Sequence, residues 1–151
     1  MKRIEGKIIT GYGVASGKGK DPRYPEGTLK IQYPYFKERG LDLGEYYLGT
    51  LNVDIAPKSF IIKTPKYFFE GIEWSNHIPP ENFYFFEAAL FYRNERYNGL
   101  IYMPDPKTKM DHEQLVTVLE VILPPIEGIS TNDFVFLEIN EDSLQIIEKP
   151  L

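Results

Sequence analysis

The chain of 151 residues contains no cysteine, and this absence removes several classes of function at once. A protein without thiols has no disulfide framework, no thiolate metal site and no cysteine nucleophile. Histidine is almost as scarce, because His77 and His112 are the two imidazoles that could act as bases or ligands. His77 precedes Ile78-Pro79-Pro80, a context typical of a loop residue and not of a ligand.

Positive charge is also in deficit, with 22 acidic against 17 basic residues and a net charge of −5. Such a chain repels a phosphodiester backbone, so non-specific nucleic-acid binding is not expected. Long hydrophobic runs are missing as well. Residues 1–6 lack the apolar core of a signal peptide, and no window approaches a membrane span. We therefore expect a cytoplasmic protein that binds neither nucleic acid nor membranes.

What the chain does contain is apolar and aromatic. Its length fits one domain, and 42% hydrophobic residues can form an ordinary core. Aromatic residues make up 15% of the chain, and Gly and Pro number 12 each, which favours short strands separated by turns. We predict a single-domain, mainly β fold.

Alternating polar and apolar residues predict where these strands lie. We expect strands at residues 4–12, 28–33, 60–63, 66–69, 83–93, 96–103 and 133–139, with one more short strand in the tail. Asn94-Glu95 suits a hairpin turn between the fifth and sixth of these.

Two segments have helical features. Residues 35–41 resemble a short helical turn that ends at Gly40. Asp111 can cap a longer helix that Pro124-Pro125 ends. Its apolar stripe has helical spacing and consists of Leu115, Val118, Leu119 and Ile122. Glu120 falls off that stripe, so we expect it to face solvent or a cleft.

The segment Gly49-Thr50-Leu51-Asn52-Val53 carries the clearest chemical pattern. Side chains alternate along a strand, so Thr50 and Asn52 should share one side while Leu51 and Val53 are buried on the other. A hydroxyl and a carboxamide oxygen suit Mg²⁺, which completes its shell with water and substrate phosphates. The alternative is a strand end at which Thr50 and Asn52 satisfy a neighbouring turn.

A glycine-rich segment follows the first predicted strand. Four glycines occur between Gly11 and Gly19, and Lys18, Lys20 and Arg23 follow closely. Backbone N–H groups and positive charge in such a loop can hold phosphate. The alternative is an ordinary surface loop without a ligand.

The order of these parts resembles the archaeal-type CTP-dependent riboflavin kinases, which are small six-stranded cradle-loop β-barrels. The resemblance is best at residues 4–13, 36–55 and 98–139, and thinnest from 56 to 82. Relative to that family the chain has an insertion at about residues 18–33. It also reads Pro124-Pro125-Ile126-Glu127-Gly128 where the family tends to carry a basic residue.

The resemblance implies a role for particular residues. Phosphate binding would fall on Gly11, Gly13 and Gly17, supplemented by Lys18 and Lys20. Thr50 and Asn52 would bind Mg²⁺. Thr108 and Glu120 would lie near the flavin, with His112 as the alternative match for Thr108 and Glu120 as general base or orienting residue. Tyr12, Tyr47 and Tyr102 are candidates for stacking on the isoalloxazine ring.

The implied reaction is transfer of phosphate from CTP, or another nucleoside triphosphate, to riboflavin, giving FMN. The implied partners are therefore small molecules, flavin and nucleotide, bound by a monomer or small homo-oligomer. The insertion and Glu127 also fit a different class of protein, a non-catalytic flavin- or nucleotide-binding barrel that has lost kinase activity. A DNA-binding relative of the barrel is disfavoured by the acidic balance.

Overall fold

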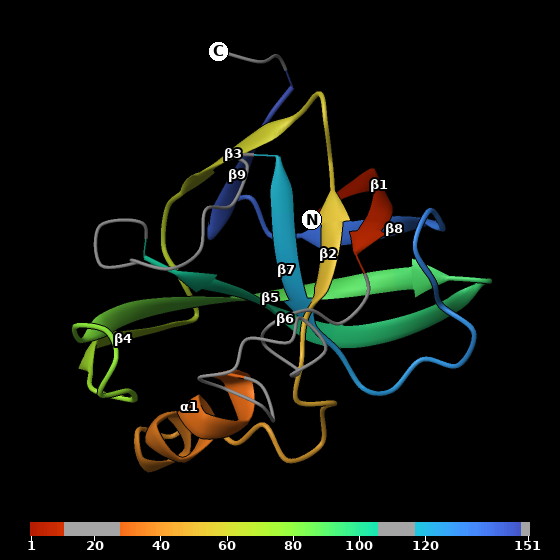
Figure 1. Cartoon of the computed structure of the whole chain (residues 1–151). Coiled ribbons are helices and arrows are strands. Elements are labelled where there is room, and N and C mark those ends of the chain that lie inside the picture. Colours follow the sequence, from red (N-terminus) through yellow and green to blue (C-terminus); the bar gives the residue numbers. More distant parts are fainter. Residues whose placement is uncertain (11–27, 106–116, 149–151) are drawn as a thin grey trace.

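The computed structural model describes residues 1–10, 28–105 and 117–148. The described elements are β1 (Lys2–Thr10), α1 (Thr28–Glu38), β2 (Leu51–Asp54), β3 (Ser59–Ile62), β4 (Tyr67–Ile72), β5 (Glu81–Tyr92), β6 (Glu95–Pro104), β7 (Val118–Ile122), β8 (Phe134–Ile139) and β9 (Leu144–Ile147). The protein is mainly β, as the sequence predicts (Figure 1).

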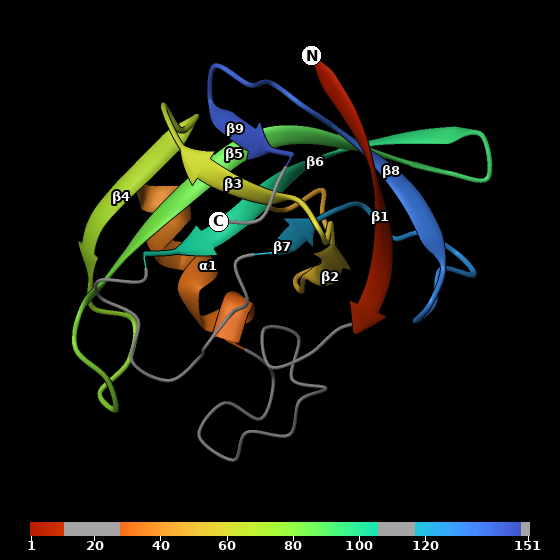
Figure 2. The same cartoon turned by 90° about the horizontal axis from the view of Figure 1, so that it is seen from above.

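Six antiparallel strands close into a barrel in the order β5, β6, β7, β2, β1 and β8 (Figures 1 and 2). Closure depends on the length of β5. Its first half pairs with β4 and its second half, Ala88 to Phe91, pairs with β8. The long strand β5 therefore pairs with the edge strand β4 at one end and closes the barrel with β8 at the other. Strands β3 and β9 form a separate two-stranded sheet.

The barrel has a hydrophobic interior and a second, outer core. Alternate residues of the strands fill the interior, among them Leu51 and Val53 of β2 and Leu119 and Val121 of β7. The outer core lies between the barrel wall and α1, where Phe36 meets aromatic rings of β4 and β5 at 5.1–5.7 Å between centroids. Helix α1 thus covers one outer face of the barrel (Figure 2).

Most of the predicted strands are confirmed within the described residues, but residues 28–33 are helical. The helix α1 buries Leu29, Gln32 and Phe36, a spacing of three and four residues. Gln32 is polar and Pro34 lies inside the helix, so the sequence lacks the continuous apolar stripe from which a helix would be predicted. The predicted end at Gly40 is confirmed, since Gly40 has a φ of +100°, which glycine adopts readily.

The second correction concerns the helix predicted from Asp111. Residues 118–122 form strand β7, while residues 111–116 lie outside the described part of the chain. Both faces of β7 are buried, Leu119 and Val121 in the barrel and Ile122 in the outer core. A strand buried on both faces has nearly continuous apolar residues, a pattern that also fits a helix.

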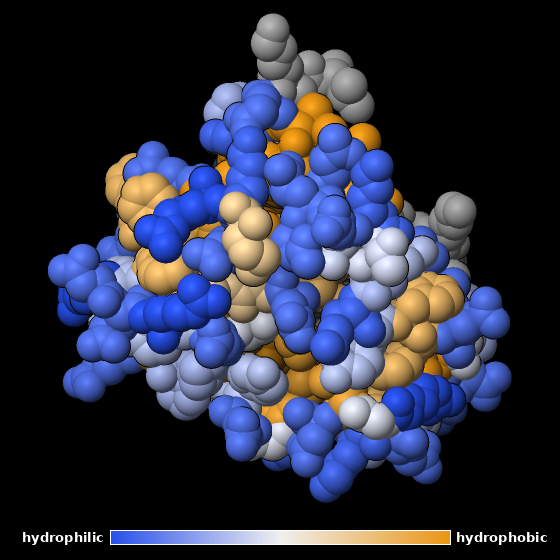
Figure 3. All heavy atoms as spheres, turned by 180° about the vertical axis from the view of Figure 1, so that it is seen from behind, coloured by the Kyte–Doolittle hydropathy of each residue, from blue (hydrophilic) through white to orange (hydrophobic). Residues whose placement is uncertain are grey.

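The hairpin between β5 and β6 forms where the sequence predicts it. Arg93 and Asn94 have φ of 50° and 65°, as in the two-residue turns that match the twist of paired strands. Viewed from behind, hydrophilic residues cover most of the surface, with smaller hydrophobic areas between them (Figure 3). Within the described ranges no helix has the length and apolar character needed to cross a membrane.

A buried hydrogen bond ties α1 to the barrel. The Tyr102 hydroxyl of β6 donates to Gln32 Oε1 at 2.7 Å, and both side chains are almost fully buried. Burial raises the pKa of Tyr102 well above its usual value, and the negative charges of Glu120 and Glu81 raise it further. The phenol therefore remains protonated and acts as the donor.

This bond gives a double-mutant test of how α1 is anchored. Tyr102→Phe should lower the free energy of unfolding by about 1–3 kcal/mol, because buried Gln32 Oε1 loses this donor. The double variant Tyr102→Phe/Gln32→Leu should recover most of that loss, since both polar groups are then gone. Urea denaturation measures both. Equal stabilities for Tyr102→Phe and the wild type would contradict the anchoring role.

Candidate functional site

The candidate site lies on the outer wall of the barrel, where β2 and β7 are neighbours. In their antiparallel register Asn52 is the partner of Glu120, so these two side chains project to the same side. Leu51 and Val53 point inward and are 2% and 0% exposed. The predicted division of this segment into a buried pair and an outward polar pair is confirmed.

Thr50 joins this outward group from the position just before β2. Its hydroxyl donates to Glu120 Oε1 at 3.1 Å, and Thr50 is 2% exposed. Thr50 and Asn52, predicted to bind metal, and Glu120, predicted to lie near the flavin, are therefore neighbours on the barrel wall. We name this group of Thr50, Asn52 and Glu120 the Thr-Asn-Glu cluster.

The oxygen of Asn52 is the most informative atom in the cluster. Asn52 Oδ1 is buried and accepts no hydrogen bond within the described part of the chain. A buried polar atom left unpaired costs about 1–3 kcal/mol, so such atoms are rare in folded proteins. An acceptor beside a hydroxyl and a carboxylate has the hard-oxygen chemistry that Mg²⁺ prefers.

The donor set fits Mg²⁺ better than it fits a transition metal. Among residues 1–10, 28–105 and 117–148, no three His, Asp or Glu side chains gather into a metal site. The Thr-Asn-Glu cluster offers one carboxylate and two neutral oxygens. Magnesium is often bound through so few protein groups because phosphate oxygens and water complete its shell.

The sheet register brings further elements to the cluster. Thr10, the last residue of β1, is the register partner of Asn52, and the glycine-rich sequence begins at the next residue. On the other side Tyr102 of β6 is the register partner of Glu120. One cross-strand row thus runs from the end of β1 through Asn52 and Glu120 to Tyr102.

Several predicted site residues cannot be placed. They are Gly11, Gly13, Gly17, Lys18, Lys20, Thr108, His112 and Tyr12, all of which lie outside the described residues. Their assignments to phosphate and flavin remain predictions.

Two aspects of the site differ from the sequence-based picture. Glu120 lies on a strand and not on a helix, because residues 118–122 belong to β7. Tyr102 is 4% exposed and its ring packs at 5.8 Å from those of Phe83 and Phe85, so it belongs to the outer core and is not available for stacking on a flavin.

Sequence reasoning also missed how Thr50 and Glu120 are linked. They are 70 positions apart in the sequence, so local patterns cannot predict the contact. Recognising residues 118–122 as a strand would have supplied the signal, because Glu120 is then the outward residue between two inward ones.

Comparison with known proteins adds no relative to these observations. No family model matches this sequence, and a search of curated proteins finds no match.

Proposed function

We propose that this protein is a Mg²⁺-dependent riboflavin kinase that transfers phosphate from CTP, or another nucleoside triphosphate, to riboflavin to give FMN. The observation that carries the proposal is the convergence of Thr50, Asn52 and Glu120 on one outward patch. The sequence resemblance assigns metal binding to the first two and a position near the flavin to the third. A kinase needs its metal ligands and its flavin-contacting residue close together, and Thr50, Asn52 and Glu120 meet this requirement.

The hydrogen bond within the cluster suits such a site. Thr50 directs its hydrogen toward Glu120 Oε1, so the lone pairs of its oxygen point elsewhere and can face a cation. Asn52 adds an oxygen without a partner among the described groups. Bound magnesium would neutralise charge on the triphosphate, the main electrostatic demand of phosphoryl transfer.

Glu120 would act on the substrate hydroxyl. A carboxylate can accept several hydrogen bonds at once, so Glu120 can hold Thr50 and a ribityl hydroxyl together. Held in this way, it would orient that hydroxyl toward the terminal phosphate and accept its proton as the new P–O bond forms and the bond from that phosphorus to the departing nucleoside diphosphate breaks. The glycine-rich sequence that follows Thr10 would hold the phosphates, as the resemblance implies.

The alternative function is a non-catalytic flavin- or nucleotide-binding barrel. It is supported by the hydrogen bond between Thr50 and Glu120, which is also what a purely structural pair would make. Glu127, which stands where the kinases tend to carry a basic residue, favours it too. Incubation of the protein with riboflavin, Mg²⁺ and each of CTP, ATP, GTP and UTP separates the two. FMN formation supports the kinase, whereas flavin or nucleotide binding without turnover with any donor supports the alternative.

Asn52→Leu tests the metal ligand without removing volume. We expect Mg²⁺-dependent turnover to fall to background, because the oxygen ligand is lost. The melting temperature should stay unchanged or rise, because Asn52 Oδ1 has no hydrogen bond to lose within the described residues. Gln145→Leu on β9 is the matched control and should retain activity. An active Asn52→Leu enzyme, or one that fails to fold, would refute the assignment.

Glu120→Gln tests the proposed base. The carboxamide introduced by this substitution can still accept from Thr50, so the free energy of unfolding should change little, while kcat falls by roughly 10²–10⁴. Thr50→Val, in contrast, removes the hydrogen bond to Glu120 and should lower the free energy of unfolding by about 1 kcal/mol. Steady-state kinetics and urea denaturation give both numbers, with Glu95→Gln as the charge-matched control. Wild-type kcat in Glu120→Gln would remove this residue from the mechanism.

A further inference from the structure

The opposite wall of the barrel carries a second group of polar side chains. In the closed ring, the β8–β5 junction lies across from the β2–β7 pair. On its outer face one cross-strand row contains Arg3, Glu138, Ala89 and Asn98, and the next contains Glu5, Phe136, Phe91 and Arg96. These rows share no residue with the Thr-Asn-Glu cluster.

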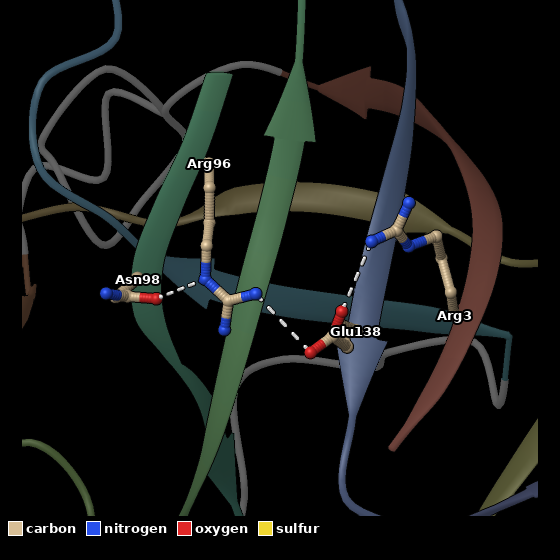
Figure 4. Close-up of polar contacts among 4 residues, drawn as sticks. All are labelled: Arg3, Arg96, Asn98 and Glu138. Atoms are coloured by element: carbon tan, nitrogen blue, oxygen red, sulfur yellow. Dashed lines mark hydrogen bonds and ion pairs between the residues drawn. The ribbon is translucent and has the colours of Figure 1, made fainter. Parts of the chain in front are cut away.

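Two arginines converge on one carboxylate in this face. Arg3 Nη2 donates to Glu138 Oε2 and Arg96 Nη1 donates to Glu138 Oε1, both at 3.4 Å (Figure 4). Arg96 Nε also donates to Asn98 Oδ1 at 3.0 Å. Both guanidiniums lie over the Phe91 ring, at 4.1 and 5.3 Å from its centroid. Arg96 is therefore held in place on three sides although it remains about half exposed.

A hollow of about 470 Å³ opens beside Arg96. Ala89 forms part of its floor, and because its side chain is only a methyl group, the space above this point of the row stays open. Arg96 and Asn98 line one wall, while Tyr46 and Tyr67 line the hollow from other elements. The lining is mixed, because charged side chains such as Lys66 and Arg96 stand beside Tyr46 and Tyr67, and a hollow of this size can hold a small polar molecule.

The carboxylates around the hollow already have partners. Glu87 forms an ion pair with Lys66 at 3.1 Å. Asp42 accepts hydrogen bonds from the Tyr33 hydroxyl and the Gly44 N–H, and these bonds lower its pKa.

Glu138 is shared between two cations. Partial burial opposes its ionisation, but the hydrogen bonds from Arg3 and Arg96 outweigh that effect and lower the pKa of Glu138. The two guanidiniums together carry one positive charge more than Glu138 balances. In a protein of net charge −5, this excess marks a local site for an anion.

We propose that Arg96 and Asn98 bind the phosphate group of a small phosphorylated molecule whose remaining part lies in the hollow against Tyr46 and Tyr67. Arg96 has N–H groups beyond those used by Glu138 and Asn98, and planar guanidinium donors match phosphate oxygens well. Arg3 is a positioning residue, because it binds the second carboxylate oxygen of Glu138 and so shares that carboxylate with Arg96. This site does not depend on the proposed kinase activity.

The test is a titration of the full-length protein followed by backbone amide NMR. The probes are inorganic phosphate and phenyl phosphate, without Mg²⁺, with sodium chloride at matched ionic strength as reference. We expect saturable shifts at Arg96, Asn98 and their neighbours, with tighter binding of phenyl phosphate because its ring contacts the tyrosines. Shifts that chloride reproduces, shifts confined to the Thr-Asn-Glu cluster, or equal affinity for both probes would overturn the proposal.

Three variants of this face should change the affinity for phenyl phosphate, two by weakening it and one by strengthening it. Arg96→Gln should weaken phenyl phosphate binding about tenfold or more, since a charged hydrogen-bond donor is lost. Arg3→Gln should weaken it less, because Glu138 then binds Arg96 alone. Glu138→Gln should tighten it a few-fold, because the competing carboxylate is removed.

Arg39→Gln on the segment that follows α1 is the charge-matched control and should bind like the wild type. If it weakened binding as much as Arg96→Gln, the effect would be one of general charge, and the proposed site would be wrong. A Glu138→Gln protein that binds more weakly would also contradict it. Thermal denaturation checks that each variant is folded.

Discussion

The pairing of β2 with β7 is the constraint on which the candidate site depends. A strand exposes alternate side chains, so a shift of one residue would turn Asn52 inward and bring Leu51 to the surface. The interior prevents that shift, because Leu51 and Val53 are packed with Leu119 and Val121 in the barrel. Hydrophobic burial inside the barrel thus fixes the geometry of polar oxygens outside it, and the site needs no separate scaffold.

The sequence was sufficient for the features that local patterns encode. Period-two alternation gave most of the described strands, and the Thr50 and Asn52 positions followed from the same rule. The sequence pattern was misleading where both faces of a strand are buried, and where a polar side chain lies in the buried stripe of a helix. Strand β7 is buried on both faces and therefore resembled a helix, while α1 places Gln32 in its buried stripe and resembled a strand. Contacts across 70 residues, such as those of Thr50 with Glu120 and Tyr102 with Gln32, have no local signal at all.

The two misread elements meet at Tyr102. This residue lies between α1, whose Gln32 accepts its hydroxyl, and β7, whose Glu120 is its register partner. The segment from residue 28 belongs partly to the insertion inferred from the family resemblance, yet it is firmly packed against the wall beside the Thr-Asn-Glu cluster. Helix α1 covers the outer core next to this part of the wall, and the six barrel strands remain paired around the ring.

The oxygen of Asn52 accepts no hydrogen bond within the described residues, so it adds nothing to the stability of the fold that they form. Replacing Asn52 with an apolar residue of similar size would remove a buried acceptor that no described residue satisfies, so contacts among residues 1–10, 28–105 and 117–148 give no reason to keep it. Glu138, on the opposite wall, shows the contrasting arrangement, in which a carboxylate and its cations satisfy one another. A buried polar atom without a partner among the described residues is consistent with the proposed ligand that arrives from solution. A cation is the simplest one for an oxygen that lies beside a hydroxyl and a carboxylate.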